Sequence, residues 1–172
     1  MSIPAPQFAT AAPFPPAEAV GATFRPLAVD GQAAWLHMPP GPTQREAGVV
    51  LVVPPGRDGR CAYRPLHDLA EAMGEAGFPT LRVEPLGAGD SEDGAPDQDL
   101  WPCWLEGVKA AVEALKREAG VRNVVVGGIR LGATIAASSE VKADGWLLMA
   151  PVASGRQWLR ELKLAASMSH TG

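Results

Sequence analysis

The stretch from Val124 to Ala133 reads Val-Val-Val-Gly-Gly-Ile-Arg-Leu-Gly-Ala, and it decides the fold of this 172-residue chain. Its β-branched beginning is typical of a strand buried on both faces, and its end is typical of the start of a helix. Gly128 and Gly132 are small enough to let a tight turn close between the two. The stretch therefore predicts a strand, a sharp turn with Arg130 at its apex, and then a helix.

Arg130 stands where a turn of this kind carries a nucleophile, in the pattern G-x-S-x-G. A guanidinium keeps its proton at accessible pH and cannot attack a carbonyl group. The sequence therefore predicts the turn without its nucleophile. If the turn is formed, the backbone angles of Arg130 should be strained, and its side chain should lie at the carboxyl end of a central parallel sheet.

Two roles for Arg130 follow from this expected place. The backbone N–H groups from Leu131 onward favour anions, and a guanidinium binds carboxylate or phosphate through two bonds, so the site could hold a small anionic ligand. Arg57, at the matching place after an earlier strand, would join the same pocket. In the other role, Arg130 pairs with an acid such as Asp90 or Glu84 and simply fills the site.

Strand and helix patterns alternate along the chain. Strands are expected at 22–29, 33–37, 48–53, 80–84, 123–127 and 145–149, and helices at 63–75, 100–119, 131–137 and 156–168. This alternation predicts a three-layer α/β/α sandwich with a mostly parallel sheet of about six strands. Residues 1–20 are rich in Ala and Pro and are expected to form a flexible arm, which leaves 21–172 as a single domain.

Composition argues against several classes of function. A net charge of −4 without a basic cluster gives nucleic acid nothing to bind. No run approaches about 18 apolar residues and no secretory signal is found, so neither a membrane span nor export is expected. Cys61 and Cys103 have neither metal-ligand nor disulfide spacing, which favours a reducing cytoplasm. No metal and no cofactor are expected.

Three segments, in order, resemble parts of the α/β-hydrolase family. The strand and loop at 49–56 look like the part that shapes the oxyanion hole, and Gly56 lies in it. Residues 87–91, Gly-Ala-Gly-Asp-Ser, look like the family's G-x-G-x-S turn, and residues 128–132 look like its nucleophile elbow. The resemblance implies the early part of that fold.

A finer resemblance concerns residues 128–134 and 150–156. Both are similar to a serine-aminopeptidase-like branch that includes hydrolases associated with the exosortase system. This resemblance implies hydrolysis of ester or amide bonds, with Gly56, Ser91 and Leu131 around the site.

The chain departs from the family in its catalytic groups. Arg130 takes the place of the nucleophile, and the acid and histidine of the family follow strands beyond the sixth. His37 and His67 lie too early to be that histidine, and His170 is two residues from the end. The serines are interpreted as turn, helix-end and capping groups rather than nucleophiles: Ser91, Ser138, Ser139 and Ser154.

Three interpretations of function stay open. The chain is a serine hydrolase by resemblance, or a pseudoenzyme that serves as a binding or scaffolding module with an anion-recognising Arg130. In the third interpretation it is an incomplete gene product whose missing part carried the acid and the base.

The family fold has two more strands after the sixth, so residues 145–149 are expected to form an apolar sheet edge. Such an edge invites pairing with another chain, and we expect a second copy or a partner chain there. The tryptophans are expected to pack in the interior, because aromatic side chains bury large areas: Trp101, Trp104, Trp146 and Trp158.

Overall fold

The computed structural model of the protein describes residues 23–41 and 45–169, so the expected arm at 1–20 lies outside the described residues. Its elements are, in chain order, β1 (Thr23–Val29), β2 (Gln32–Met38), β3 (Ala47–Val52), α1 (Arg57–Glu75), β4 (Thr80–Val83), α2 (Leu100–Ala119), β5 (Asn123–Ile129), α3 (Leu131–Ser138), β6 (Gly145–Met149) and α4 (Gly155–Ser169). No helix within these ranges has both the length and the apolar character that a bilayer crossing requires.

The six described strands form one sheet in the order β1-β2-β4-β3-β5-β6. Strands β4, β3, β5 and β6 run parallel, whereas β1 and β2 are antiparallel neighbours at one edge. The hairpin between β1 and β2 turns at Asp30 and Gly31, whose φ angles of 48° and 75° are those that an Asp-Gly hairpin turn adopts. The predicted, mostly parallel sheet is confirmed.

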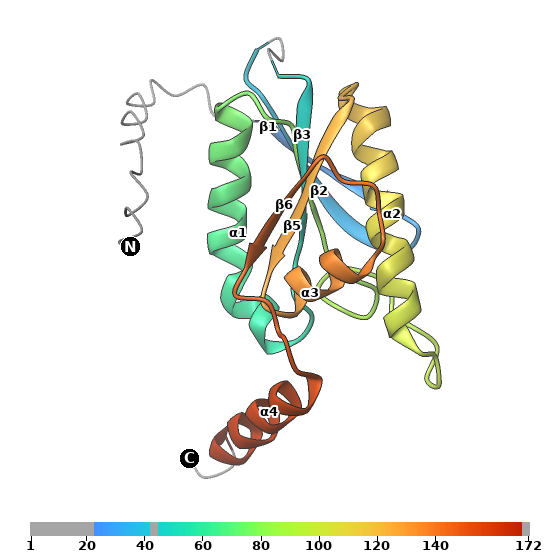
Figure 1. Ribbon diagram of the computed structural model, residues 1–172, viewed down its shortest axis with the longest axis vertical. Helices are drawn as coiled ribbons and strands as arrows, with labels where there is room; N and C mark the ends of the chain where they lie inside the picture. The colour runs from blue at the N-terminus through green and yellow to red at the C-terminus, as the bar shows by residue number, and fades with distance from the viewer. Residues whose placement is uncertain (1–22, 42–44, 170–172) are drawn as a thin grey trace, which may run out of the picture.

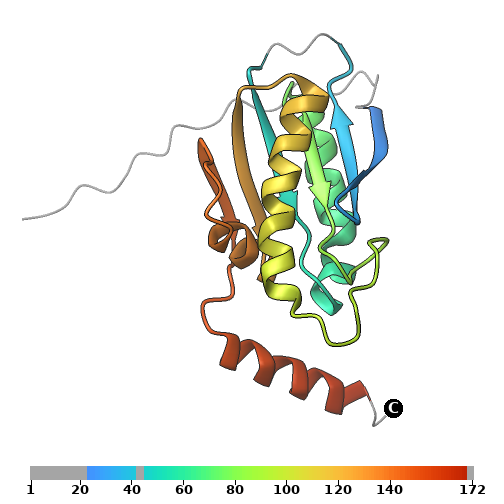
Figure 2. The same cartoon turned by 90° about the vertical axis from the view of Figure 1, so that its right-hand side faces the viewer.

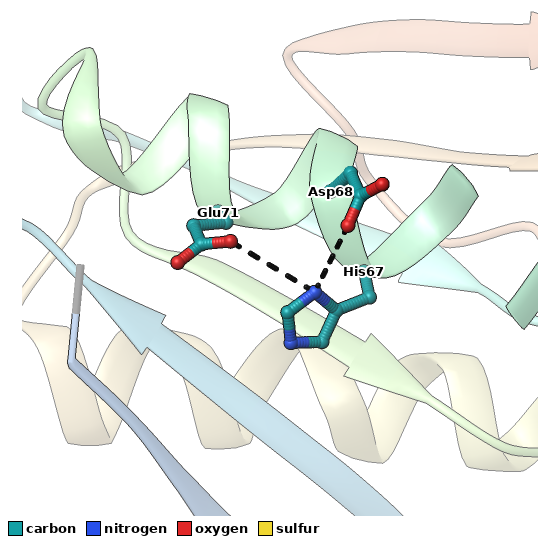
Figure 3. Close-up of side chains that lie close together, drawn as sticks. All are labelled: His67, Asp68 and Glu71. Carbon is teal, nitrogen blue, oxygen red and sulfur yellow. Dashed lines mark hydrogen bonds and ion pairs between the residues drawn. The ribbon is translucent and has the colours of Figure 1, made fainter. Parts of the chain in front are cut away.

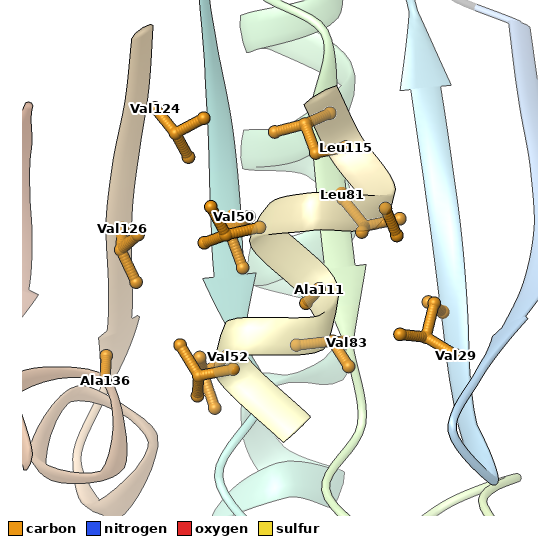
Figure 4. Close-up of a cluster of buried hydrophobic side chains, with 14 of the residues drawn as sticks. Val29, Val50, Val52, Leu81, Val83, Ala111, Leu115, Val124, Val126 and Ala136 are labelled. Carbon is orange, nitrogen blue, oxygen red and sulfur yellow. The ribbon is translucent and has the colours of Figure 1, made fainter. Parts of the chain in front are cut away.

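Helices cover both faces of the sheet, with α1 on one face and α2 and α3 on the other (Figures 1 and 2). The β-branched runs of the central strands form the core on the second face, where Val50, Val52 and Val126 pack with Leu115 of α2 (Figure 4). Burial of each such side chain stabilises the fold by about 1.5–3 kcal/mol relative to exposure. The three-layer α/β/α architecture is therefore as predicted.

Helix α1 begins at Arg57, earlier than the predicted start near Tyr63. The sequence predicted a loop over residues 54–59, but Gly59 is part of the first helical turn. A Cβ atom added there would run into the carbonyl oxygen of Pro54, so the close approach of helix and loop requires glycine. Asp58 lies in the same first turn, where the helix dipole favours an acid.

The outer edge of β6 is unpaired among the described residues, since β6 hydrogen-bonds only with β5. Its Trp146 and Leu148 are 46% and 40% exposed, and Trp101 of α2 is 36% exposed. The expectation that Trp101 and Trp146 pack in the interior was wrong, because an aromatic side chain is buried only where an opposing layer covers it. Trp104 is partly buried, and its indole N–H donates to the carbonyl of Leu86 over 2.8 Å. Association through the β6 edge stays a prediction.

Helix α4 lies beyond the carboxyl ends of the parallel strands, apart from the two helical layers (Figures 1 and 2). Leu159 and Leu164 on it are 52% and 60% exposed. Trp158, by contrast, is partly buried against the main core. This helix places its acidic residue Glu161 beside the turn that follows β5.

Candidate functional site

The turn after β5 has the strained geometry that the sequence predicts. Arg130 has φ 53° and ψ −126°, a conformation that costs a non-glycine residue about 1–3 kcal/mol. Its backbone N–H donates to the carbonyl of Met149 over 2.9 Å, which fixes the turn to β6. A Cβ atom added at Gly128 would lie 2.6 Å from the Val52 oxygen and 2.7 Å from the carbonyl carbon of Gly132. Only a glycine fits there, and the turn closes at the carboxyl end of the parallel sheet.

The guanidinium of Arg130 is bound by two carboxylates from two different helices. Its Nη2 donates to Oε2 of Glu161 on α4 over 2.7 Å, and its Nε donates to Oδ2 of Asp58 on α1 over 3.4 Å. The hydrogen bond that Arg130 donates to Glu161 is the largest influence on the pKa of Arg130, and together with the one it donates to Asp58 it raises this pKa above the ordinary value. All three side chains are partly exposed, so each ion pair is worth about 0.2–1 kcal/mol.

The prediction that Arg130 pairs with Asp90 or Glu84 was wrong. Glu84 is 3% exposed, and its carboxylate accepts the backbone N–H of Asp90 over 2.7 Å, within the loop that follows β4. The two acids that do reach Arg130 are 72 and 31 residues away in the chain. Local spacing therefore carries no signal for these pairs.

Several hollows lie at the carboxyl ends of the strands, and two of them are lined in part by the first turns of α1. One, of about 190 Å³, is lined by Arg57, Asp58, Arg130 and α4. The other, of about 670 Å³, is lined by Gly56 and by the loop 87–90, among others. The structure thus brings the two predicted arginines together and places Gly56 in the neighbouring hollow.

The other predicted site residues serve the fold in this structure. Leu131 is 8% exposed and belongs to the core, so it offers a ligand only its backbone. The hydroxyl of Ser91 donates to the carbonyl of Glu84 over 2.7 Å and accepts the N–H of Ala33 over 2.9 Å. This serine is a turn residue, as the sequence predicts.

Two of the remaining candidate serines also have local partners. The Ser139 hydroxyl donates to the carbonyl of Ala136 at the end of α3, and that of Ser154 accepts the N–H of Gln157 at the start of α4. Ser138 is the last residue of α3. No hydrogen bond joins a serine to a histidine among residues 23–41 and 45–169, and His170 lies outside these ranges.

No family model matches the chain, and no curated protein is similar to it in sequence. Solved structures do resemble it. They include a hypothetical protein from Pseudomonas aeruginosa (17% identity, TM-score 0.62, covering 87% of this chain and 53% of that one). A serine hydrolase without a lid from Xanthomonas campestris has 16% identity and a TM-score of 0.58, covering 80% of this chain and 78% of that one. A serine hydrolase homologue from Coxiella burnetii has 18% identity and a TM-score of 0.53, covering 73% and 72%.

The chain has the α/β-hydrolase fold. At these identities the likeness extends to the fold alone, and the chain spans about half of the Pseudomonas protein's length. In this fold, the turn at Arg130 lies after β5, the strand between β3 and β6, and the two hollows lie at the same end of the sheet.

Sequence reasoning missed Asp58 and Glu161. Asp58 was placed in a loop, and the position of α4 could not be read from its own residues. The only available signals were that Asp58 is an acid near the start of a helix and that Glu161 is an acid on the last predicted helix. Neither signal identifies Arg130 as the partner.

A second group of polar side chains lies between α1 and the sheet, and sequence reasoning missed it as well. His37 of β2 is fully buried, and its ring centroid is 5.3 Å from that of His67 on α1. Arg82 of β4 is 1% exposed, and its guanidinium carbon lies 4.9 Å above the ring of Tyr63. Burial, with smaller contributions from the charges of Arg82 and His67, lowers the pKa of His37 from 6.5 to about 4. The imidazole of His37 is therefore neutral at physiological pH.

Proposed function

We propose that this chain is a non-hydrolytic binding module with the α/β-hydrolase fold, in which Arg130 recognises a carboxylate or phosphate at the place where a hydrolase carries its nucleophile. By resemblance it is similar to the serine-aminopeptidase-like branch. The observation that carries the proposal is the guanidinium at the apex of the strained turn, held by Glu161 and Asp58.

The chemistry of the site argues against hydrolysis by the described residues. Arg130 has no lone pair to offer a carbonyl carbon. The hydroxyl of Ser91 is engaged in two short hydrogen bonds to backbone groups, and no base activates it. His37 of β2 and His67 of α1 pack against each other, and neither hydrogen-bonds with a serine within the described ranges.

The same geometry favours recognition of an anion. The guanidinium already binds two carboxylates, and the one on α4 is the more exposed, with 47% of the Glu161 side chain accessible against 29% for Asp58. A ligand carboxylate can therefore replace Glu161 while Asp58 continues to orient the guanidinium. Arg57 lines the same hollow and adds positive charge there, beside the N-terminus of α3.

Serine hydrolysis is the second candidate. It is favoured by the larger hollow, which lies at the carboxyl ends of β3 and β4 and is lined by Gly56 and the loop 87–90. A fluorophosphonate probe distinguishes the two candidates, because it labels an activated serine wherever it lies in the chain. The binding-module proposal expects no labelled serine and no turnover of an activated p-nitrophenyl ester. A labelled serine whose replacement abolishes turnover would establish the hydrolase instead.

Binding is tested by thermal unfolding in acetate, citrate and inorganic phosphate. An anion at ten times its dissociation constant should stabilise the chain by about 1.4 kcal/mol, which raises Tm by about 3–6 °C. Arg130→Gln should abolish this rise, and Glu161→Gln should produce it at lower anion concentration because the internal competitor is lost. Arg117→Gln, which removes an exposed guanidinium on α2, is the matched control and should respond like the wild type. An unchanged response in Arg130→Gln would refute the proposal.

A further inference from the structure

Three potential metal ligands gather on the surface of α1: His67, Asp68 and Glu71 (Figure 3). Nδ1 of His67 lies 3.4 Å from Oδ1 of Asp68 and 3.9 Å from Oε2 of Glu71, and the three ligand atoms all lie within 4.8 Å of one another. His67 and Glu71 are one helical turn apart and so share a face of the helix. The side chains are half-buried or exposed, and a solvated ion can reach them.

A buried histidine on the sheet packs against His67 of this cluster. His37 on β2 is 0% exposed, and both of its ring nitrogens lack a hydrogen-bond partner. Its ring meets that of His67 edge to face, with 5.3 Å between the centroids. Buried polar groups almost always have hydrogen-bond partners, so a buried imidazole with two unpartnered nitrogens indicates a binding site for a ligand. A metal ion is a ligand that accepts the lone pair of a neutral imidazole.

We propose that His67, Asp68 and Glu71 form a binding site for a divalent transition metal ion, which His37 completes from the sheet. Imidazole and carboxylate ligands together suit Zn²⁺ and its neighbours in the first transition row, and four ligands suit the tetrahedral geometry of Zn²⁺. This site is independent of the anion site at Arg130.

The geometry and the charges of the cluster fit such an ion. Ligand atoms that each lie about 2.0–2.1 Å from Zn²⁺ are separated by about 3.3 Å in a tetrahedron, close to the spacing around Nδ1 of His67. Arg82 places a positive charge near His37, which would repel a cation. The two carboxylates, Asp68 and Glu71, balance the charge of the ion and so offset this repulsion. Asp68 also pairs with Arg64 over 3.7 Å, but that arginine side chain is 89% exposed and can be displaced at little cost.

Isothermal titration of ZnCl₂ into the full, tag-free chain, stripped of metal with EDTA, tests the cluster. The wild type should bind one equivalent. His67→Gln and Glu71→Gln should each weaken binding at least tenfold. Glu75→Gln removes an exposed acid one turn further along α1 and is the matched control, which should bind like the wild type. The absence of a saturable site in the wild type, or zinc affinity in His67→Gln and Glu71→Gln equal to that of the wild type, would overturn the proposal.

The role of His37 needs a separate measurement, because a substitution in the buried layer can disturb folding. X-ray absorption at the zinc edge of the loaded wild type counts the imidazole ligands directly. Two imidazoles together with carboxylate oxygens are expected. A count of one imidazole would show that His37 is not a ligand of the ion. Bound Co²⁺ offers an independent readout, since a four-coordinate site gives intense visible absorption and a six-coordinate site gives weak bands.

Discussion

Replacing Arg130 with alanine and with glycine tests the strained turn. Both variants lose the guanidinium and its bonds to Glu161 and Asp58, so they differ only in the presence of a Cβ atom at φ 53° and ψ −126°. At an ordinary position glycine is the less stable of the two, because it loses more backbone entropy on folding. At this turn we expect the order to be reversed.

The magnitude follows from two opposing terms. Relief of the strained conformation stabilises the glycine variant by about 1–3 kcal/mol. The extra backbone entropy of glycine costs about 0.5–1 kcal/mol. Arg130→Gly should therefore exceed Arg130→Ala in unfolding free energy by about 1 kcal/mol. The lost ion pairs are exposed, so Arg130→Ala should be no more than about 2 kcal/mol less stable than the wild type.

Urea unfolding followed by circular dichroism measures these differences through the shift in midpoint at constant slope. Ala137→Gly is the matched control, since Ala137 is an exposed residue of the adjacent helix α3 with ordinary backbone angles. It should lower stability by about 1 kcal/mol. If Arg130→Ala were as stable as Arg130→Gly or more so, the turn would not store strain, and our description of it would fail.

Three further predictions concern stability. Gly128→Ala should destabilise the chain by about 1–3 kcal/mol, measured by urea unfolding, because the new methyl group would lie 2.6 Å from the Val52 oxygen. Thr134→Val should lower the free energy of unfolding by about 1–3 kcal/mol in the same assay, because the Thr134 hydroxyl accepts the N–H of Val152 and donates to its carbonyl. Thr134→Ser keeps a hydroxyl there and should retain most of the wild-type stability. His37 has a pKa of about 4 in the folded chain and 6.5 when unfolded, so the stability gained from its neutral form is complete above pH 6.5 and is lost as the pH falls toward 4. Urea unfolding in the presence of EDTA should show that the unfolding free energy of the wild type falls more steeply between these pH values than that of His37→Phe. The additional loss should reach up to about 3 kcal/mol in total. An equal pH dependence of stability in the two proteins would contradict the lowered pKa of His37.

The sequence was most informative where the structure depends on short stretches of chain. The β-branched runs in β3 and β5, followed by small residues, predicted buried parallel strands and the turn at Arg130, and both are present. The Asp-Gly turn between β1 and β2 is local in the same way, since its φ angles depend only on the residues that adopt them.

Sequence reasoning failed where a local signal had to be weighed against packing. Gly59 suggested a loop, yet it lies inside α1 because the helix approaches the Pro54 carbonyl too closely for any larger residue. Trp146 was expected in the interior, yet it lies on an edge strand whose covering layer is not among the described elements. In both cases the residue type was compatible with two environments, and the neighbouring element decided between them.

The order of strands and helices and the sharp turn after β5, with Arg130 at its apex, could be read from short stretches of the chain, because each depends on residues within a few positions of one another. Only the tertiary structure decided that Arg130 meets Asp58 and Glu161 and that His37 faces His67. These pairs are distant in the chain, and their meeting depends on how the helices dock on the sheet. That docking is fixed by the packing of the whole core, which no single stretch of sequence encodes.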